Sequence, residues 1–311
     1  MSLLKKKEKA IVKVCKLKTW VYCCVVSLCC FSATVTAWSP QGHGIIAINA
    51  YRNLRHNDPA AANTFMMYAR LLYKHQKGSS KKLYGQCLGA KELCYLAQWP
   101  DFVKKVPLKD LWPNLAPELF KAYLPKSTAS WHYHNNFYSH ETHSFIRHCT
   151  NSGKLLEVLP LLVEAFEREA NTENQAVILS FIVHLVGDAH QPLHSVSAIN
   201  HGCEHDLGGN RVCIQKKHAK CERSLHALWD DGAGLFRSPQ EFTLTQHIKA
   251  GTSDFESWIT ESSSYVGRVY LQDRNYDTES YKTRVQTISR ARVKKAVANL
   301  EGLLVALMSK K

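Results

Sequence analysis

The sequence predicts an all-α protein, a single mainly helical domain, and three observations lead to this fold class. An apolar run from Ala176 to Val186 follows a predicted helix start near Thr172, where a hydroxyl is expected to cap the first turn. A helix that is apolar on all sides is a buried one. Apolar residues recur at three- and four-residue steps over 281–308, which predicts an amphipathic helix that closes the core. Strand-like runs are few and short, such as 211–215. Functional sites are therefore expected between helices.

The first 37 residues have the pattern of a secretory signal peptide. Seven lysines and one acidic residue lie within 5–18, an apolar run follows over 20–31, and the segment ends in a small residue, Ala37. This order predicts export with cleavage after Ala37. The apolar run is shorter than the roughly 20 residues of a membrane span, so an uncleaved anchor helix is the less favoured alternative. We therefore expect a signal peptide at 1–37 and one domain at 38–311, secreted or periplasmic, with no stable membrane anchor after cleavage.

The segment 38–311 is basic and rich in histidine. It has 33 basic and 25 acidic residues and contains all 16 histidines of the chain. A positive surplus of this size attracts polyanions such as nucleic acid or anionic lipid, although it carries no information about fold. No repeat, low-complexity tract or long linker divides the segment, which favours one domain.

An even number of cysteines remains after the predicted cleavage, and the six are Cys87, Cys94, Cys149, Cys203, Cys213 and Cys221. In an exported chain such a set predicts up to three disulfides. Their pairing stays open. The alternative is a few free buried thiols, because 274 residues can bury a sufficient core without disulfides.

Candidate metal ligands are concentrated in the predicted buried helix. His184 and Asp188 are four residues apart, so both side chains leave one face of the helix about 5 to 6 Å apart at Cβ. Imidazole nitrogen and carboxylate oxygen can share one zinc ion, with a third ligand from elsewhere. A carboxylate in an apolar helix must otherwise be paired or protonated. A histidine–aspartate hydrogen bond without metal is the alternative.

Further histidines and acids follow the same pattern. His190 and His194 come next, with a proline between them that ends the helix, and His226 and Asp230 form a second pair at four-residue spacing in apolar helical sequence. Embedding in apolar sequence argues against solvated side chains for both pairs.

Other candidates are weaker when they are taken alone. The pairs His201 with His205 and His218 with Glu222 lie in a polar, cysteine-rich segment, where solvated side chains are expected. Asp101 follows Trp-Pro, where we expect a break in the chain. His132 lies among aromatic residues. Its spacing alone does not favour it as a ligand over three nearby histidines, which are His134, His140 and His143.

The order of these motifs points to a family. The motifs are Trp38 with His43, Trp-Pro-Asp101, Trp-His132-Tyr, His184-xxx-Asp188 followed by His-Gln-Pro-Leu-His194, Gly208-Gly209-Asn210, and Leu-His226-xx-Trp-Asp230. Together they resemble the zinc-dependent single-strand nucleases typified by mung bean nuclease, and the resemblance covers almost all of 38–311. It implies a mainly α-helical bundle with three zinc ions at the base of a cleft, a fold shared with bacterial zinc phospholipases C.

The resemblance also implies how two of the three zinc ions are held. One ion has the ligands Asp101, His132 and His184. A second ion has the ligands His194, His226 and Asp230.

The third ion is implied to bind at the amino end of the domain. Its ligands are His43 and Trp38, the latter through its free α-amino group and carbonyl oxygen, and Asp188 bridges this ion and the first. The nitrogen of Trp38 is an amide until cleavage occurs after Ala37, so export would complete the enzyme.

The resemblance assigns two catalytic and three substrate-binding residues. Asp101 is implied to orient the attacking water as well as to bind zinc, and Lys104 to contact phosphate, where a cation offsets developing charge. The substrate-binding residues are Tyr133, which stacks on a base, Asn135 and Asn210. Stacking on an aromatic ring requires an unpaired base, which gives the preference for single strands a physical basis.

Three positions depart from the family pattern. Asn135 stands where family members commonly have an acid that reads the base edge, Ser224 stands where Asn is frequent, and Gly232 stands where some members have a second stacking aromatic. The metal site is intact while the base-reading parts differ, which affects base preference first.

The predicted function is a secreted endonuclease that cuts single-stranded DNA and RNA to 5′-phosphate products. Two nearby zinc ions are expected to lower the pKa of a bound water molecule, so that hydroxide is available near neutral pH. A 3′-nucleotidase activity and a monomeric state are also expected. The alternative is a zinc-dependent phospholipase C, which shares a Trp-Ser start; its last ligand pair is typically His-xxx-Glu, however, and here it ends in Asp230. A third alternative is a non-catalytic zinc-binding protein, suggested only by the histidine content.

Overall fold

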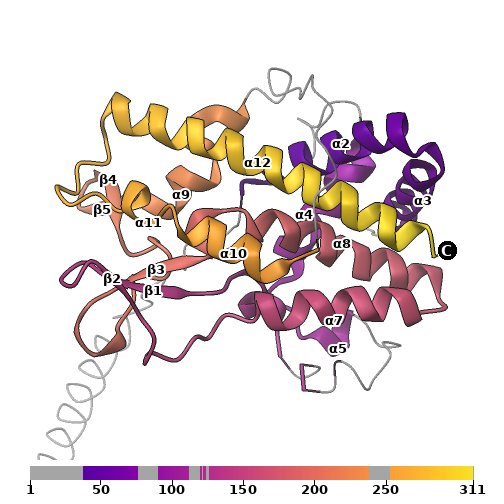
Figure 1. Ribbon diagram of the computed structural model, residues 1–311, viewed down its shortest axis with the longest axis horizontal. Coiled ribbons are helices and arrows are strands. Elements are labelled where there is room, and N and C mark those ends of the chain that lie inside the picture. Colours follow the sequence, from indigo (N-terminus) through magenta and orange to yellow (C-terminus); the bar gives the residue numbers. More distant parts are fainter. Residues whose placement is uncertain are drawn as a thin grey trace, which may run out of the picture. The chain divides into compact units, whose positions relative to one another are not determined.

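The structure is a computed structural model that describes residues 38–75, 90–111, 120, 122–123, 126–237 and 253–310 (Figure 1). The predicted signal peptide at 1–37 and Cys87 lie outside these residues. All described residues belong to one compact unit. Helices dominate it and the strands are short, so the predicted fold class is confirmed. Among the described helices, none is both long and apolar enough to span a membrane.

The elements follow one another as short and long helices with two small sheets. The α-helices are α2 (Pro40–Asn57), α3 (Pro59–His75), α4 (Lys91–Val103), α5 (Leu108–Leu111), α7 (Leu155–Arg168), α8 (Thr172–Ala189), α9 (Leu225–Asp230), α10 (Phe255–Ser263), α11 (Val266–Val269) and α12 (Glu279–Met308). The 3-10 helices are η2 (Thr128–His132), η3 (Pro192–His194), η4 (His201–Cys203) and η5 (Gly232–Arg237). The strands are β1 (Asn136–Ser139), β2 (Ser144–Ile146), β3 (Val196–Ile199), β4 (Cys213–Lys217) and β5 (Lys220–Ser224).

Helix α8 is the centre of the helical layer. It contacts α2, α3, α4, α7, α10 and α12, and every residue from Ile178 to Ala189 is buried, as its all-round apolar sequence predicts. We expected a hydroxyl to cap its first turn near Thr172. Instead the cap is Asn171, whose side-chain oxygen accepts hydrogen bonds from the backbone N–H groups of Glu173 and Asn174, because a side chain one residue earlier reaches both N–H groups without helical φ/ψ angles.

Helix α4 continues through Pro100, so the expected chain break before Asp101 is wrong. A proline inside a helix leaves the carbonyl four residues earlier without its usual N–H partner. Here that carbonyl belongs to Leu96, and it accepts a hydrogen bond of 2.6 Å from the Ser180 hydroxyl of α8. The helix is therefore tolerated because a neighbouring helix supplies the missing donor, and Asp101 lies in its last turns.

The longest helix is α12, which lies along α2 and also contacts α3, α7 and α8 (Figure 1). Its start two residues before the predicted Tyr281 is fixed by Thr278, whose hydroxyl accepts a hydrogen bond from the Tyr281 N–H. Val285, Ile288 and Val293 are buried, which confirms the predicted amphipathic helix.

Two small sheets lie beside the helices. Strand β1 pairs antiparallel with β2 and parallel with β3, and the chain between the parallel strands contains α7 and α8. Strands β4 and β5 form a hairpin that a disulfide between Cys213 and Cys221 closes, and this hairpin includes part of the strand predicted at 211–215.

A second disulfide joins Cys149 to Cys203, 54 residues apart in sequence. Cys94 is disulfide-bonded as well. The alternative of free thiols is therefore wrong for the five described cysteines.

Candidate metal centre

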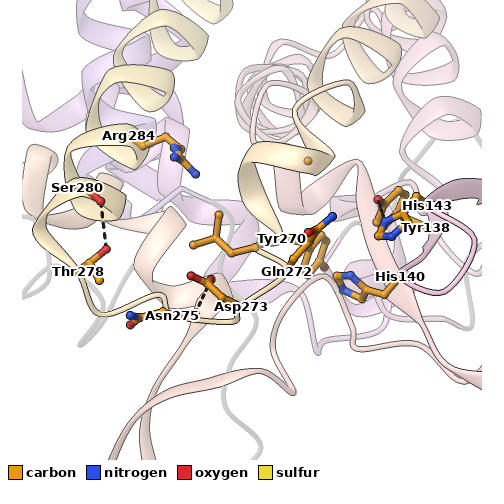
Figure 2. A pocket seen from close by; sticks show the side chains of 12 residues that line it. Tyr138, His140, His143, Tyr270, Gln272, Asp273, Asn275, Thr278, Ser280 and Arg284 are labelled. Atoms are coloured by element: carbon orange, nitrogen blue, oxygen red, sulfur yellow. Dashed lines mark hydrogen bonds between the residues drawn. The ribbon is translucent and has the colours of Figure 1, made fainter.

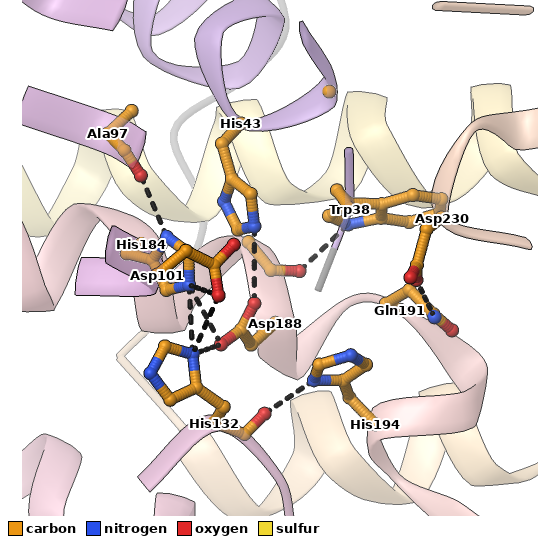
Figure 3. Close-up of polar contacts among 12 residues, drawn as sticks. Trp38, His43, Ala97, Asp101, His132, His184, Asp188, Gln191, His194 and Asp230 are labelled. Atoms are coloured by element: carbon orange, nitrogen blue, oxygen red, sulfur yellow. Dashed lines mark hydrogen bonds and ion pairs between the residues drawn. The ribbon is translucent and has the colours of Figure 1, made fainter. Parts of the chain in front are cut away.

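Three groups of largely buried side chains could each hold a metal ion. Within each group, the potential ligand atoms lie within 4.8 Å of one another. The groups are His43 with His184 and Asp188; Asp101 with His132 and His184; and His194 with His226 and Asp230. They come from α2, α4, η2, α8, η3 and α9. The structure thus brings together eight of the nine residues predicted as metal ligands, from segments far apart in sequence. Figure 3 shows them except for His226, which is not labelled there.

The first two groups share His184, and the Asp188 carboxylate on the last turn of α8 also approaches both of them. Its Oδ1 atom lies 3.3 Å from Nε2 of His43, and its Oδ2 atom lies 3.1 Å from Nδ1 of His132 and 3.4 Å from Nε2 of His184. One carboxylate therefore faces both groups, each with a different oxygen. This is the arrangement needed for the bridging role that the sequence suggested, and that role stays a prediction.

The ring of His43 stacks on the ring of His184, with centroids 3.9 Å apart. Gly187 allows this approach. A Cβ atom at Gly187 would lie 2.7 Å from Nδ1 of His43, so any larger residue would push the imidazole away from Asp188.

Asp101 completes the second group at the end of α4. Its Oδ1 atom lies 3.8 Å from Nδ1 of His132, 3.9 Å from Nε2 of His184 and 3.0 Å from Nζ of Lys104. The Lys104 ammonium is buried against the cluster, so a fixed positive charge lies beside the candidate ligands.

Hydrogen bonds to backbone carbonyls fix which nitrogen of three histidines carries a proton. The Nδ1 atoms of His184, His194 and His226 lie 2.7, 2.5 and 2.7 Å from the carbonyl oxygens of Ala97, His132 and Gly208. A carbonyl only accepts, so each Nδ1 carries the hydrogen and each Nε2 presents a lone pair.

The third group shows what these lone pairs require. The Nε2 atoms of His194 and His226 face each other at 3.1 Å, and Nε2 of His226 lies 3.4 Å from the Asp230 carboxylate. Two lone pairs and a carboxylate at such distances repel one another. A cation between them would turn this repulsion into coordination.

The distances also fit zinc. Two ligand atoms of a tetrahedral zinc with bonds of about 2.0 to 2.1 Å lie about 3.3 to 3.4 Å apart. The ligand atoms here are separated by 3.0 Å between His184 and His132 and by 3.4 Å between His226 and Asp230. Imidazole and carboxylate donors are compatible with zinc and also with iron, nickel and copper.

Several buried atoms of the cluster also lack a hydrogen bond within the described part of the chain: both ring nitrogens of His43, Nε2 of His132 and Oδ1 of Asp188. Buried polar atoms are normally satisfied. One pair of these unsatisfied atoms, Oδ1 of Asp188 and Nε2 of His43, lies 3.3 Å apart, and a cation bound between these two atoms would satisfy both.

Burial sets the protonation of the cluster. It lowers the pKa of His43, His132 and His194 well below the usual value, so these imidazoles are neutral and can act as ligands. Burial, followed by the charge of Asp101, raises the pKa of Asp188 well above the usual value of a carboxyl group. A cation would offset this cost, because a positive charge favours the ionised carboxylate.

Trp38 lies at the amino end of α2, fully buried beside the cluster. Its indole N–H donates to the carbonyl of Gly187 at 2.9 Å, and its ring packs edge-on against Phe236. The next residue, Ser39, donates its backbone N–H to the carbonyl oxygen of Asp230 at 2.6 Å. The start of the domain is therefore held between α8 and α9, and the ligand role of its backbone stays a prediction.

A cavity of about 450 Å³ opens beside the cluster, and three candidate ligands, His132, His194 and His226, form part of its wall. Lys104, Tyr133 and Asn135 also line it, so three of the predicted catalytic and substrate residues share one cavity with the metal groups. The Asn135 side chain accepts a hydrogen bond of 2.8 Å from the Ser197 hydroxyl.

Asn210 is placed differently. Its side-chain N–H donates to the carbonyl of Leu207 at 2.8 Å, and it is absent from the residues that line the cavity. The Gly208–Gly209 part of its motif instead orients the metal group, because the Gly208 carbonyl holds Nδ1 of His226.

His205 lies in a different position from the one predicted from the sequence. It was expected to be solvated, but it is half-buried and lines the cavity together with Lys126 and Leu207. The antiparallel bridge to Ile199 and the contact with the ring of Phe137 bring it inward. No local sequence signal distinguishes such a histidine from the exposed His218.

Gln191 is a further missed residue. Its side-chain N–H donates to Oδ1 of Asp230 at 2.8 Å, which orients one candidate ligand. Its position between two histidines in the motif was the available signal, because amide side chains commonly support metal-binding carboxylates.

Comparisons with known proteins agree with this site. The sequence description of the S1/P1 nuclease family matches residues 38–309. Endonuclease 5 of Arabidopsis thaliana is 29% identical over 153 residues, 49% of this chain and 47% of that protein. Endonuclease 3 of the same plant is 27% identical over 146 residues, 45% and 42% of the two chains. Nuclease S1 of Aspergillus oryzae is 28% identical over 123 residues, 36% and 40%. The chain thus matches somewhat under half the length of these relatives.

Proposed function

Because the chain belongs to the S1/P1 nuclease family, we propose that it is a zinc-dependent endonuclease that hydrolyses phosphodiester bonds of single-stranded DNA and RNA to 5′-phosphate products. The observation that carries the proposal is the convergence of imidazole lone pairs and buried carboxylates beside a cavity. The names of the plant and fungal relatives, endonucleases and a nuclease, support it. A 3′-nucleotidase activity of the same site is part of the proposal.

The proposed zinc ligands are those of the three groups together with Trp38, for three ions in all. Zinc supplies a Lewis acid that activates water near neutral pH and neutralises the charge of a phosphodiester. The remaining steps belong to the protein. The free oxygen of the Asp101 carboxylate can orient the attacking water, and the Lys104 ammonium, held 3.0 Å from Asp101, can approach a phosphate oxygen from the cavity.

Substrate selection is proposed to take place in the same cavity. The half-buried ring of Tyr133 lines it, and its hydroxyl lies 3.1 Å from that of Ser152, which fixes the ring. A base that stacks on this ring must be free of its partner strand. The amide of Asn135 can donate to a base edge or accept from it, whereas a carboxylate at this position would only accept. We therefore expect a base preference different from that of an enzyme with an acid here.

We further propose that residues 1–37 are a signal peptide, that the monomeric domain 38–311 is secreted or periplasmic, and that Trp38 becomes its amino terminus. The basic, apolar and small-residue order of 1–37 supports cleavage. The disulfides Cys149–Cys203 and Cys213–Cys221 support an oxidising compartment.

The test is a measurement of zinc content and of products for the protein that begins at Trp38. Single-stranded DNA, RNA, duplex DNA, a 3′-mononucleotide and phosphatidylcholine are incubated in parallel. Three zincs per chain and 5′-phosphate products from the single strands are expected. Release of phosphocholine with nucleic acid untouched would indicate a phospholipase C instead, and bound zinc without any turnover would indicate a non-catalytic protein.

Two matched histidine substitutions complete the test. His226→Ala removes one candidate ligand, and His218→Ala removes one exposed imidazole from the turn between β4 and β5. Only His226→Ala is expected to lose zinc and activity. Equal loss in both variants would mean that zinc binds non-specifically to surface histidines.

A further inference from the structure

We propose that a second cavity, separate from the metal centre, binds one nucleotide of the single-stranded substrate. The cavity has a volume of about 540 Å³. Its walls come from β1 and the turn after it, from α11, from the first turns of α12 and from the segment that joins these two helices (Figure 2). It shares no lining residue with the cavity at the metal centre. The inference rests on the proposed function, because the occupant is taken to be part of the strand that is cut.

One wall of the cavity is aromatic. The ring of His140 lies edge-on to two tyrosine rings, with centroids 5.6 Å from Tyr138 and 5.4 Å from Tyr270. Tyr270 is fixed because its hydroxyl donates to Asp206 at 2.8 Å. Tyr270 is buried and supports the ring of His140, while the rings of Tyr138 and His140 are partly exposed. A nucleobase can stack on such partly exposed rings without sequence preference.

The opposite wall carries a cation. Arg284 projects from the first turns of α12 on the side away from Tyr138 and His140 (Figure 2). Within the described residues it has no carboxylate at ion-pair distance, whereas Lys282, two residues earlier, pairs with Asp277 and Glu279. A guanidinium without a carboxylate partner is suited to a phosphate group, and the hydroxyls of Thr278 and Ser280 line the cavity on the same side.

The floor between the walls offers hydrogen-bonding groups of both kinds. Gln272 and Asn275 contribute amides and Asp273 contributes a carboxylate, one oxygen of which accepts the backbone N–H of Asn275 at 3.1 Å. The carboxylate would repel a phosphate but would accept from an amino group on a base. A simple anion would leave the rings unused and a free base would leave Arg284 unused, so a nucleotide fits the three parts of the lining together.

Strand β1 connects the two cavities. Tyr133 and Asn135 precede it and line the metal-side cavity, while Tyr138 and His140 lie at its other end and line the second cavity. From Asn135 to Tyr138 an extended chain covers about 10 Å. A single strand with one nucleotide at the metal centre therefore needs only a short extension to place another in the second cavity.

The kinetic test uses substrate length. Tyr138→Leu removes one ring while it keeps an apolar side chain, and Arg284→Gln removes the cation. For each variant kcat/KM is measured on a dinucleotide, which occupies the metal-side cavity alone, and on a 12-residue oligothymidylate. We expect cleavage of the dinucleotide to be unchanged and kcat/KM on the 12-mer to fall about 5- to 100-fold for Tyr138→Leu, as loss of one stacked base predicts.

A binding test does not depend on catalysis. The Kd of a nuclease-resistant phosphorothioate 12-mer is measured as a function of salt. Each phosphate contact with a single strand contributes about 0.7 to the slope of log affinity against log salt, so Arg284→Gln should reduce the slope by about 0.7. Arg52→Gln, which removes an exposed cation of α2 outside both cavities, should leave it unchanged.

The outcomes separate the two proposals. Absence of cleavage of every nucleic acid by the unmodified protein would contradict the proposed function, and the binding test would still decide the cavity. An unchanged Kd and salt slope in Arg284→Gln, or an equal loss of kcat/KM on the dinucleotide and on the 12-mer in Tyr138→Leu, would overturn the nucleotide subsite.

Discussion

Two parts of the candidate metal centre have the same kinds of proposed ligand, but different elements support them. The first part, which we name the helical group, consists of His43, Asp101, His132, His184 and Asp188. The second, which we name the loop group, consists of His194, His226 and Asp230. Long helices carry all of the helical group except His132. The loop group is carried by η3 and by the six-residue helix α9.

The supports differ in physical kind. Helix α8 is buried along its last three turns and contacts six other α-helices, so packing fixes Asp188, and packing together with the Ala97 carbonyl fixes His184. In the loop group individual hydrogen bonds hold the ligands: Gly208 orients His226 and Gln191 orients Asp230. Packing is distributed over many contacts, whereas a single hydrogen bond can be lost with one substitution. The loop group should therefore be the part that changes first when nearby residues change.

The largest effect is expected for Asp188→Ala, because this carboxylate faces His43 with one oxygen and His132 with the other. Two of three zincs should be lost, and removal of metal stabilisation worth several kcal/mol should lower kcat/KM by about 10³-fold or more. Zinc content and single-strand cleavage are the measurements. Asp230→Ala is the comparison, with one zinc lost. A normal zinc content in Asp188→Ala would contradict a bridging role.

The next effect concerns Trp38 and Ser39, which contact α8 of the helical group and α9 of the loop group. A protein that keeps extra residues before Trp38 has an amide there instead of an amine, and its added chain must leave a buried position. We expect at least about tenfold lower activity and fewer than three zincs. Cleavage of the extension by a specific protease is the control, and it should restore both values. Full activity of the extended protein would exclude the α-amino ligand.

A smaller effect is expected from Gly208→Ala, which acts on the loop group alone. The new Cβ would lie 2.3 Å from the Leu193 carbonyl oxygen, so the backbone must shift and the carbonyl that orients His226 moves with it. We expect about 10- to 100-fold weaker binding of one zinc, measured by competition with a chelator. Gly202→Ala has a similar positive φ with nothing within 4 Å of its Cβ. It should bind all zincs normally, and equal weakening in both variants would assign the effect to backbone strain.

The smallest effect concerns pH. Asp206 accepts hydrogen bonds from Ala198 and Tyr270 beneath the Gly208–Gly209 turn, and burial raises the pKa of its carboxyl to about 6. The folded protein therefore holds a proton that the unfolded chain releases near pH 4. Stability should fall by up to about 3 kcal/mol as pH rises from about 4 to about 6.

Asp206→Asn should remove that part of the pH dependence. The measurement is the free energy of unfolding of both proteins at several pH values between 4 and 7. As pH rises over this range, the free energy of unfolding of Asp206→Asn should increase relative to that of the unmodified protein. Parallel curves would show that Asp206 titrates normally.

The comparison of the two groups also explains which features the sequence could predict. The sequence predicts helix α8 from a continuous apolar run and α12 from apolar residues at three- and four-residue steps, because both patterns are local in the sequence. Spacing likewise indicated His184 with Asp188 and His226 with Asp230. The order of motifs indicated Asp101 and His132, whose place in the centre depends on tertiary structure.

The features that escaped prediction depend on contacts between distant segments. Pro100 remains inside a helix because Ser180 of another helix bonds the released carbonyl. His205 faces the cavity because β3 and its neighbours pull it inward. The parallel pairing of β1 with β3 joins strands separated by α7 and α8. Nothing in the local sequence records these partners.

The two ends of the described domain differ in a way that matters for protein production. Trp38 is fully buried, whereas Lys310 after α12 is exposed and forms an ion pair with the surface residue Glu167. An affinity tag or fusion partner attached before Trp38 would compete with core packing. The same tag attached beyond Lys310 would extend into solvent, so purification and immobilisation of this protein should use the end that follows α12.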